Sequence, residues 1–260
     1  MPEGIEVELY RKTALKALNR RINIINTVDS KYLPKVFNSL DLKNLLEGNY
    51  FTEAKRKGKL LILSLSNGFH IGLRFGMTGR LLVDGKSAIE TLEYSSSRNN
   101  PIWDRFSLEF QDGGSLSIRD PRRLGAVEIN PNLDALGVDL YEVTGTALTE
   151  ILTNSTQPVK ARLMNQTKIS GLGNLLSDEI LWRSSIDPRR PSHSLSRNDK
   201  RRLLHHIKRT VYELTDRGGS HMGNLQSHRT IGGLCPKDGE LLDRYKIGGR
   251  TTYSCPKHQN

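Results

Sequence analysis

Cysteine is scarce in this sequence, and long apolar runs are missing. The 260 residues include two cysteines, both near the C-terminus, which argues against a disulfide scaffold because such a scaffold needs more cysteines spread along the chain. The apolar stretches are brief and broken by polar residues, so neither a membrane-spanning segment nor a signal peptide is expected. We therefore expect a soluble, intracellular protein.

Acidic residues are also in short supply relative to basic ones. The chain has 39 Lys and Arg residues against 28 Asp and Glu residues, which gives a net charge of +11. An excess of this size points to a polyanionic partner, most often nucleic acid, with an acidic membrane surface as the alternative. The length suits one large domain or two modest ones.

Hydrophobic periodicity divides the chain into a strand-rich part and a helical part. Apolar residues at helical spacing predict an amphipathic helix over Glu3–Leu18, directly after the N-terminus. Between about 50 and 130, alternating apolar residues flank Asn67-Gly68 and again Asp112-Gly113, which is the pattern of two β-hairpins. Hairpins at this density predict an antiparallel sandwich or barrel.

The helical part begins after a stretch with many turn residues and no sustained period, which predicts a linker. Its clearest helix follows Ser196, where Ser196 and Asp199 fit a capping box and Gly218 fits a helix stop. The predicted buried stripe of this helix consists of Leu203, Ile207, Val211 and Leu214.

The first residues, M-P-E-G, offer a candidate nucleophile. A second residue this small is usually exposed by removal of the initiator methionine, which would leave Pro2 as a free secondary amine. An α-amino group titrates near ~8, so roughly a tenth of it is unprotonated at neutral pH. Such an amine can form a Schiff base with a carbonyl carbon. Many chains begin Met-Pro for no chemical reason, and that is the alternative.

A second signal is the G-L-G-N sequence within Gln166–Pro188, immediately before a helical period. Backbone N–H groups at such a helix N-terminus form an anion site suited to a DNA phosphate, and a tight turn between helices is the alternative. The whole segment resembles the helix-two-turn-helix element of the formamidopyrimidine-DNA glycosylase and endonuclease VIII family. The opening M-P-E-G-I-E-V-E is also similar to that family, and the resemblance covers nearly the whole chain in order.

The resemblance implies a role for each candidate catalytic residue. Pro2 would displace the damaged base at C1′ and form an imine with the opened sugar, while Glu3 supplies and accepts protons beside it. Lys59, in K-R-K-G-K-L, stands at the place of the family's catalytic lysine, with a solvated basic turn as the alternative. Arg250, five residues before Cys255, would be the arginine that reaches the phosphate at the lesion.

The resemblance also implies residues that hold the DNA. The sequences R-F-G-M-T-G and R-D-P-R-R-L-G-A resemble two loops that fill the gap left by a flipped base, with Met77, Arg122 and Leu124 as the wedge. Such wedges offset part of the cost of unstacking. Leucine replaces the usual phenylalanine, and ordinary core positions are the alternative for Met77 and Leu124. Asn174 and Lys160 would hold phosphates.

The C-terminal segment has the spacing C-x2-D-x16-C-x2-H through Cys235, Asp238, Cys255 and His258. All four are residue types that bind zinc, although a carboxylate is less usual in a closed structural site. Many members of the family carry a four-cysteine zinc hairpin here, so the resemblance implies a structural zinc ion. The alternatives are a hairpin that folds without metal and a disulfide between the cysteines.

The implied fold is α+β and multidomain: an N-terminal helix with an antiparallel β-sandwich, then a helix-two-turn-helix domain with a zinc-finger-like β-hairpin. We place the catalytic helix and sandwich at 1–130, a linker at 131–150, the helix-two-turn-helix DNA-binding domain at 151–228 and the hairpin at 229–260.

The implied function is a bifunctional DNA glycosylase and AP lyase of base excision repair. It would act as a monomer on double-stranded DNA that contains oxidised bases or abasic sites, without a redox cofactor and without binding membranes. The loop before the hairpin is short compared with the loop that closes over 8-oxoguanine in formamidopyrimidine-DNA glycosylases. This favours an endonuclease VIII-like preference for oxidised pyrimidines and ring-opened purines. The alternatives are a non-catalytic damaged-DNA-binding protein of the same fold and a nucleic-acid module that shares only parts of it.

Overall fold

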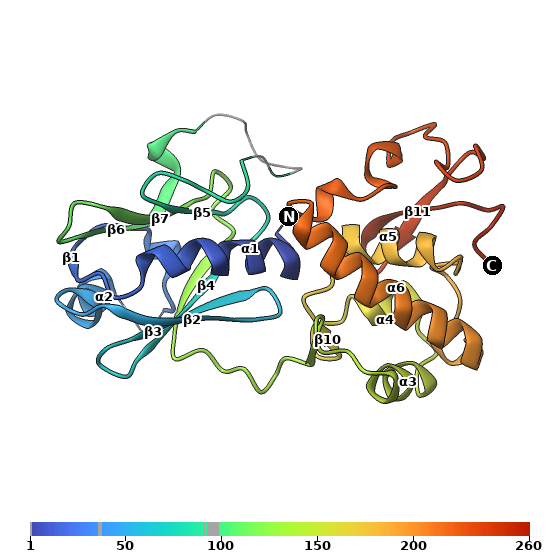
Figure 1. Ribbon diagram of the computed structural model, residues 1–260, viewed down its shortest axis with the longest axis horizontal. Coiled ribbons are helices and arrows are strands. Elements are labelled where there is room, and N and C mark those ends of the chain that lie inside the picture. Colours follow the sequence, from blue (N-terminus) through green and yellow to red (C-terminus); the bar gives the residue numbers. More distant parts are fainter. Residues whose placement is uncertain (1, 36–37, 91, 93–98) are drawn as a thin grey trace. The chain divides into compact units, whose positions relative to one another are not determined.

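The computed structural model describes residues 2–35, 38–90, 92 and 99–260, and the chain forms two compact units (Figure 1). The first unit consists of Pro2 and residues 6–133, and the second consists of residues 3–5 and 134–260. The boundary therefore passes through the first helix, whose initial residues pack with the second unit.

The first unit is built from two four-stranded antiparallel sheets, with strand orders β1-β6-β7-β5 and β2-β3-β4-β8. Its elements are α1 (Gly4–Ala14), β1 (Ile22–Val28), α2 (Ser39–Leu46), β2 (Phe51–Lys57), β3 (Leu60–Leu65), β4 (His70–Arg74), β5 (Arg80–Val83), β6 (Asp104–Phe110), β7 (Ser115–Arg119) and β8 (Ala126–Ile129). The two predicted hairpins are confirmed as β3–β4 and β6–β7, where Gly68 and Gly113 adopt positive φ angles of 85° and 86°. Glycine adopts such angles at no steric cost, which suits it to tight turns.

One apolar core joins the two sheets and α1. Leu63 of β3, Phe106 of β6 and Tyr10 of α1 belong to the same cluster of buried side chains. Tyr10 also donates a hydrogen bond to the carbonyl of Gly79 (3.2 Å), just before β5. The predicted antiparallel sandwich is therefore confirmed, with α1 packed against its core.

The second unit is mainly helical. Its elements are β9 (Val138–Asp139), α3 (Gly145–Thr153), α4 (Val159–Leu163), β10 (Ile169–Ser170), α5 (Asn174–Arg183), α6 (Arg197–Asp216), β11 (Asp243–Ile247) and β12 (Arg250–Ser254). The predicted capping box at Ser196 and Asp199 is present at the start of α6, and Gly218 follows its end with φ 102°. The predicted stripe of α6 is fully buried.

The segment 131–150, predicted as a linker, contains a short strand and the start of a helix. β9 pairs in parallel with β10, and Thr144 caps α3 by accepting a hydrogen bond from the Ala147 N–H (3.2 Å). Leu148 is buried in the core of the second unit. β9 is only two residues long, and five residues separate it from α3. The segment therefore shows no sustained hydrophobic period from which either element could be predicted.

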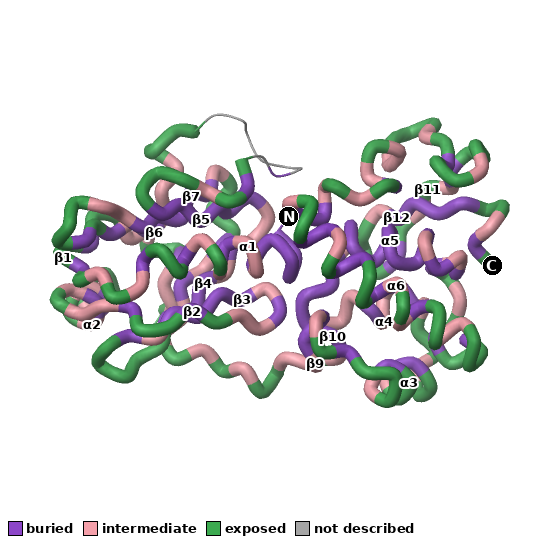
Figure 2. Tube along the Cα trace, in the orientation of Figure 1, coloured by how far each residue is buried: buried purple, intermediate pink, exposed green. Residues whose placement is uncertain are grey.

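Helix α5 is the most buried helix of the second unit (Figure 2). All residues from Leu175 to Trp182 are buried, including Asp178 and Glu179. The polar side chains of a helix that is covered on every side need hydrogen-bond or ion-pair partners from elsewhere in the protein, because water does not reach them. None of the helices in the described part of the chain has the length and apolarity needed to cross a lipid bilayer.

Candidate functional site

The Glu3 carboxylate caps the N-terminus of α5. Its Oε2 accepts hydrogen bonds from the N–H groups of Gly173 (2.9 Å) and Leu176 (3.2 Å), and its Oε1 accepts one from Leu175 (2.8 Å). The side chain is fully buried. Three N–H donors and the positive end of the helix dipole stabilise negative charge on this carboxylate.

Glycines make room for this contact. A Cβ atom on Gly173 would lie 2.4 Å from the Glu3 Cδ, and a Cβ atom on Gly4 would lie 3.0 Å from the Gly171 Cα and 2.4 Å from the Leu140 Cδ2. The Gly4 N–H donates to the Gly171 carbonyl (2.8 Å). The glycines of G-L-G-N therefore allow the start of α1 to approach the backbone before α5.

This geometry corrects the prediction that the G-L-G-N backbone forms a site for a DNA phosphate. The anion held by these N–H groups belongs to the protein itself, because Glu3 accepts from Gly173, Leu175 and Leu176. The predicted anion site at a helix N-terminus is present, but its anion is a side chain about 170 residues away in the sequence. Hydrophobic periodicity carries no information about a partner at that distance.

Asn174 is the first residue of α5 and is partly exposed. Its buried Oδ1 has no hydrogen-bond partner among the described residues. An amide N–H can donate to a phosphate oxygen, so the predicted role of Asn174 stays open to test.

Pro2 and Lys59 belong to the first unit. Pro2 is buried and directly precedes Glu3 in the chain, and Lys59 is half-buried in the turn between β2 and β3. Arg56 supports this turn by donating to the Gly58 carbonyl (3.0 Å) and forms an ion pair with Glu8 of α1 (3.3 Å). The turn that carries Lys59 is thus connected to the helix that follows Pro2.

The two predicted wedge loops meet in the first unit, and Asp120 joins them. This buried carboxylate accepts hydrogen bonds from the hydroxyl groups of Thr78 and Tyr32 and from the backbone N–H groups of Arg122 (3.2 Å), Leu124 (2.8 Å) and Gly125 (3.0 Å). Thr78 directly follows Met77 in the chain. Sequence reasoning missed Asp120, although it lies inside the quoted R-D-P-R-R-L-G-A motif.

The wedge side chains differ in exposure. Leu124 is 49% exposed, Arg122 is exposed and Met77 is partly buried. The backbone of Leu124 lies so close to Gly76 that a Cβ atom there would be 2.5 Å from the Leu124 carbonyl oxygen. The structure therefore brings the two loops together and leaves the side chain of Leu124 half-exposed, so it is not an ordinary core position.

The two neighbouring arginines of this motif have different environments. Arg123 adopts a positive φ of 55° and binds Asp29 through two hydrogen bonds of 2.7 Å each. The Arg123 guanidinium holds the pKa of the Asp29 carboxyl below its usual range. Arg122 makes no ion pair with the described residues. Arg123 therefore anchors the loop, and Arg122 remains available at its surface.

The prediction that Lys160 holds a phosphate is not supported by the structure. Lys160 is fully buried, forms an ion pair with Asp178 of α5 (2.7 Å) and donates to the hydroxyl group of Thr252 in β12 (2.8 Å). Arg229 binds the same carboxylate (2.9 Å). Burial lowers the pKa of Lys160 and raises that of Asp178, and the opposite charges offset part of both changes. Lys160 therefore connects α4, α5 and the C-terminal hairpin.

Arg250 is exposed at the tip of that hairpin, directly after the turn Gly248-Gly249, whose φ angles are 56° and 74°. The backbone of the next residue is fixed by a hydrogen bond, because the Lys160 Nζ donates to the Thr251 carbonyl (3.3 Å). The hairpin therefore presents an arginine to solvent on a fixed backbone.

The four predicted metal ligands come together in the second unit. Their ligand atoms lie within 4.8 Å of one another, and the residues are Cys235, Asp238, Cys255 and His258. The His258 Nδ1 lies 2.6 Å from an Asp238 oxygen, and the Cys255 Sγ lies 3.4 Å from both oxygens of the same carboxylate. Both cysteines are buried and free, which removes the disulfide alternative. Two thiols, an imidazole and a carboxylate at this separation fit a tetrahedral metal ion.

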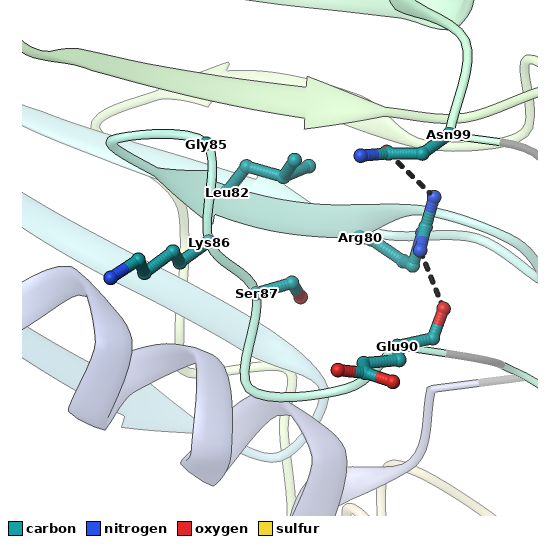
Figure 3. A pocket seen from close by; sticks show the side chains of 7 residues that line it. All are labelled: Arg80, Leu82, Gly85, Lys86, Ser87, Glu90 and Asn99. Carbon is teal, nitrogen blue, oxygen red and sulfur yellow. Dashed lines mark hydrogen bonds between the residues drawn. The ribbon is translucent and has the colours of Figure 1, made fainter.

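A pocket of about 580 Å³ lies beside β5 (Figure 3). Arg80 lines it and donates to the Glu90 carbonyl (2.5 Å) and to the Asn99 side chain (3.3 Å). Burial lowers the pKa of this arginine. None of the candidate site residues lines this pocket.

The chain is similar to known proteins over nearly its whole length. Residues 1–127 match the family model of the formamidopyrimidine-DNA glycosylase N-terminal domain, and residues 136–224 match the H2TH domain of the same enzyme. The chain is 31% identical to the formamidopyrimidine-DNA glycosylase of Moorella thermoacetica over 275 residues, which cover 95% of each chain.

Two solved structures of the Lactococcus lactis Fpg protein show the same fold. One is a complex with DNA that contains an abasic site (TM-score 0.83, 99% of each chain covered), and the other is a complex with DNA that contains an oxidised pyrimidine (TM-score 0.84, 100% of each chain covered). Both are 24% identical to this chain, so they bear on its fold alone. From the two domain matches and the full-length relative, we conclude that this chain belongs to the formamidopyrimidine-DNA glycosylase family.

Proposed function

We propose that this protein is a bifunctional DNA glycosylase and AP lyase of base excision repair that works through a Schiff base on Pro2. The observation that supports this most is the Glu3 carboxylate, which is buried, fixed by three N–H groups and adjacent in sequence to Pro2. A catalytic carboxylate must be held in one geometry, and here the N-terminus of α5 holds it.

The proposed reaction starts with attack by the Pro2 amine on C1′ of the damaged nucleotide. The C1′–N bond breaks, the base leaves with a proton, and the opened sugar forms an iminium ion with Pro2. The iminium acidifies the neighbouring C–H bond, so loss of that proton expels the 3′ phosphate, and a second elimination releases the 5′ phosphate. Glu3 is the proposed group that gives and takes protons beside the imine. No redox cofactor is needed because no step transfers electrons to an acceptor.

Lys59 and Arg250 are the proposed cations of the reaction. Lys59 lies in a turn that is supported by Arg56, and Arg250 lies at the exposed tip of the β11–β12 hairpin. Each could pair with a phosphate as negative charge develops on the leaving oxygen. Asn174 is the proposed phosphate donor from α5.

The proposed wedge consists of Met77, Arg122 and Leu124, on the two loops that Asp120 holds together. An apolar side chain and an arginine can replace a base that leaves the stack, which offsets part of the few kcal/mol that extrusion costs. The half-exposed Leu124 supports this role.

We propose double-stranded DNA with oxidised bases or abasic sites as the substrate and a monomer as the active form. The net charge of +11 and the damaged DNA in the complexes of the Lactococcus lactis protein support this. The proposed preference is for oxidised pyrimidines and formamidopyrimidines, with 8-oxoguanine as the less favoured substrate. The named relative is a formamidopyrimidine-DNA glycosylase, so the endonuclease VIII-like leaning rests on the sequence: the short segment before Cys235, together with M-P-E-G and R-F-G-M-T-G.

We also propose a structural zinc ion bound by Cys235, Asp238, Cys255 and His258. The donor set and the spacing of its atoms support this. The ion would fix the C-terminal segment that carries Arg250, since a closed four-ligand site contributes folding energy to the segment that it joins.

Borohydride trapping tests the mechanism directly. The protein, confirmed to have lost Met1, is incubated with duplexes that contain 8-oxoguanine, a formamidopyrimidine, thymine glycol, dihydrouracil or an abasic site. We expect a covalent adduct through the N-terminal peptide, and the order of rates identifies the preferred lesion. Pro2→Gly should keep DNA binding and lose most of the adduct.

The competing function is a non-catalytic damaged-DNA-binding protein of the same fold. Such a protein would bind the same duplexes with the same salt dependence but give no adduct with any of them. That result, from protein that binds DNA, would overturn the proposed enzyme.

A further inference from the structure

Trp182, in the last turn of α5, contacts two of the four proposed metal ligands. Its indole Nε1–H donates a hydrogen bond to the Cys235 Sγ (3.3 Å), and its backbone carbonyl lies 3.4 Å from the His258 Nε2. The Trp182 and His258 rings meet edge to face with centroids 6.1 Å apart. Trp182 also belongs to the apolar cluster that contains both cysteines.

The contact with His258 determines which nitrogen faces the other ligands. When Nε2 carries the proton and donates to the Trp182 carbonyl, Nδ1 keeps its lone pair. That Nδ1 lies 2.6 Å from an Asp238 oxygen and 3.8 Å from the Cys235 Sγ, inside the cluster. Metal-binding histidines are commonly oriented in this way through their second ring nitrogen.

The contact with Cys235 acts on the sulfur. An N–H group that donates to a thiolate stabilises its negative charge, as do other charge-assisted hydrogen bonds. Because Trp182 is only 8% exposed and Cys235 only 2%, water does not compete freely for this bond.

We propose that Trp182 is a positioning residue of the metal site, which orients His258 to bind through Nδ1 and stabilises the thiolate of Cys235. This inference rests on the proposed metal site and assigns to it a residue outside the C-x2-D-x16-C-x2-H motif. It also means that the helix whose first turn holds Glu3 supports the metal site with its last turn.

The first test compares Trp182→Phe with Trp103→Phe, which changes the other tryptophan of the chain. The full-length apo protein is titrated with Zn²⁺ against a competing chelator. We expect Trp182→Phe to weaken Zn²⁺ binding by about 10-fold to 100-fold, as loss of an outer-shell partner usually does. Trp103→Phe should bind Zn²⁺ like the unchanged protein.

Co²⁺ provides a spectroscopic signature that general destabilisation would not produce. Loss of the N–H···S bond makes the Cys235 thiolate a stronger electron donor, so the thiolate-to-Co²⁺ charge-transfer band should move to lower energy in Trp182→Phe. The ligand-field bands should keep the intensity of a tetrahedral site, because all four ligands remain.

An isostere covers the case in which Trp182→Phe fails to fold. In the Trp103→Phe background, replacing Trp182 by 3-benzothienylalanine keeps the fused ring and removes only the N–H donor. The same shift of the Co²⁺ band is expected.

Two negative results have different meanings. If the unchanged protein binds neither Zn²⁺ nor Co²⁺, the proposed metal site fails and the role of Trp182 fails with it. If the unchanged protein binds both ions while the Trp182 variants match it in affinity and spectrum, only the role of Trp182 is overturned.

Discussion

Two buried carboxylates, one in each unit, hold backbone N–H groups for opposite purposes. Asp120 in the first unit accepts from the backbone of Arg122, Leu124 and Gly125, all within five residues of it. Glu3 in the second unit accepts from the start of α5, about 170 residues away. Asp120 is a support, and two of the residues that it positions, Arg122 and Leu124, are exposed to solvent. Glu3 is itself the proposed reactive group, and the helix is its support.

The largest expected effect concerns Glu3. Glu3→Gln keeps the size of the side chain and removes its charge, so proton transfer beside the imine is lost. We expect single-turnover base release to fall by about 10²-fold to 10⁴-fold, which is the usual contribution of a general acid or base. DNA affinity should change little, as measured by anisotropy on an abasic-site analogue.

A glycine variant tests whether the position of Glu3 matters, because it displaces the carboxylate and leaves its chemical nature unchanged. The added Cβ of Gly173→Ala would overlap the Glu3 side chain, so base release should also fall by about 10²-fold. Gly145→Ala is the matched control, because its Cβ would lie 3.5 Å from Leu204 in ordinary contact. Equal rates for the two glycine variants would contradict a positioned Glu3.

The next effect concerns a third carboxylate, Asp178, which is held mainly by cations, with one long N–H contact from Tyr253 (3.4 Å). Lys160→Met leaves Arg229 as the one cation that the described residues place against this buried carboxylate, so the free energy of unfolding should fall by about 3 kcal/mol in urea. The exposed Lys208→Met is the control and should stay within about 0.5 kcal/mol of the unchanged protein. A phosphate-binding Lys160 would instead lower DNA affinity and leave stability unchanged.

Asp120→Asn should have a somewhat smaller effect on stability. An amide offers one oxygen and one NH₂ group where Asp120 meets five donors, so at least one buried donor loses its partner. We expect a loss of about 2 kcal/mol in the free energy of unfolding. The rate of borohydride trapping on an already abasic duplex should fall less than the rate of base release from a paired lesion, because only the latter requires the wedge. Equal losses in both assays would count against the wedge.

The smallest effect separates the two neighbouring arginines. Arg122→Ala should reduce the slope of log affinity against log salt by about 1, the value for one phosphate contact. Arg123→Ala should leave that slope unchanged, because Arg123 is paired with Asp29. The reverse pattern would exchange their roles.

The Asp29–Arg123 pair also has a defined pH dependence. Arg123 lowers the pKa of Asp29 in the folded protein, so the pair stabilises the fold above the pKa of an unpaired aspartate, about 3.9, and this stabilisation is lost as the pH falls through the folded value. Arg123→Ala should therefore be less stable than the unchanged protein above about pH 4, and this difference should shrink as the pH falls through the folded pKa of Asp29. An unchanged profile would show that the pair contributes nothing.

Sequence reasoning identified the two hairpins, the capped helix α6 and the clustered quartet of candidate metal ligands, because each depends on spacing within a short stretch. The two hairpins are marked by Asn67-Gly68 and Asp112-Gly113, and the capping box by Ser196 and Asp199. Such local patterns can be recognised in the sequence without knowledge of the fold.

Long-range partners were beyond the reach of periodicity. The occupant of the α5 N-terminus is Glu3, the partner of Lys160 is Asp178, and the support of the wedge loops is Asp120. Each is a polar residue that is buried because of its partner, and nothing in its neighbouring residues records that partner. Lys160 illustrates the result, since it was expected to hold a DNA phosphate and is instead buried against Asp178.

The length of α5 has a consequence for how this unit can change. This helix of ten residues makes four sets of polar contacts along its length. Its first turn binds Glu3, and its Asp178 binds Lys160 and Arg229. Its Glu179 accepts from the backbone of Asn224 and Leu225, and its Trp182 contacts two proposed metal ligands. Adding or deleting a single residue would rotate everything beyond it by about 100° and shift it by about 1.5 Å. A substitution in α5 changes one contact, which a second substitution at its partner can restore. An insertion would instead move every later side chain of the helix away from its partner at the same time.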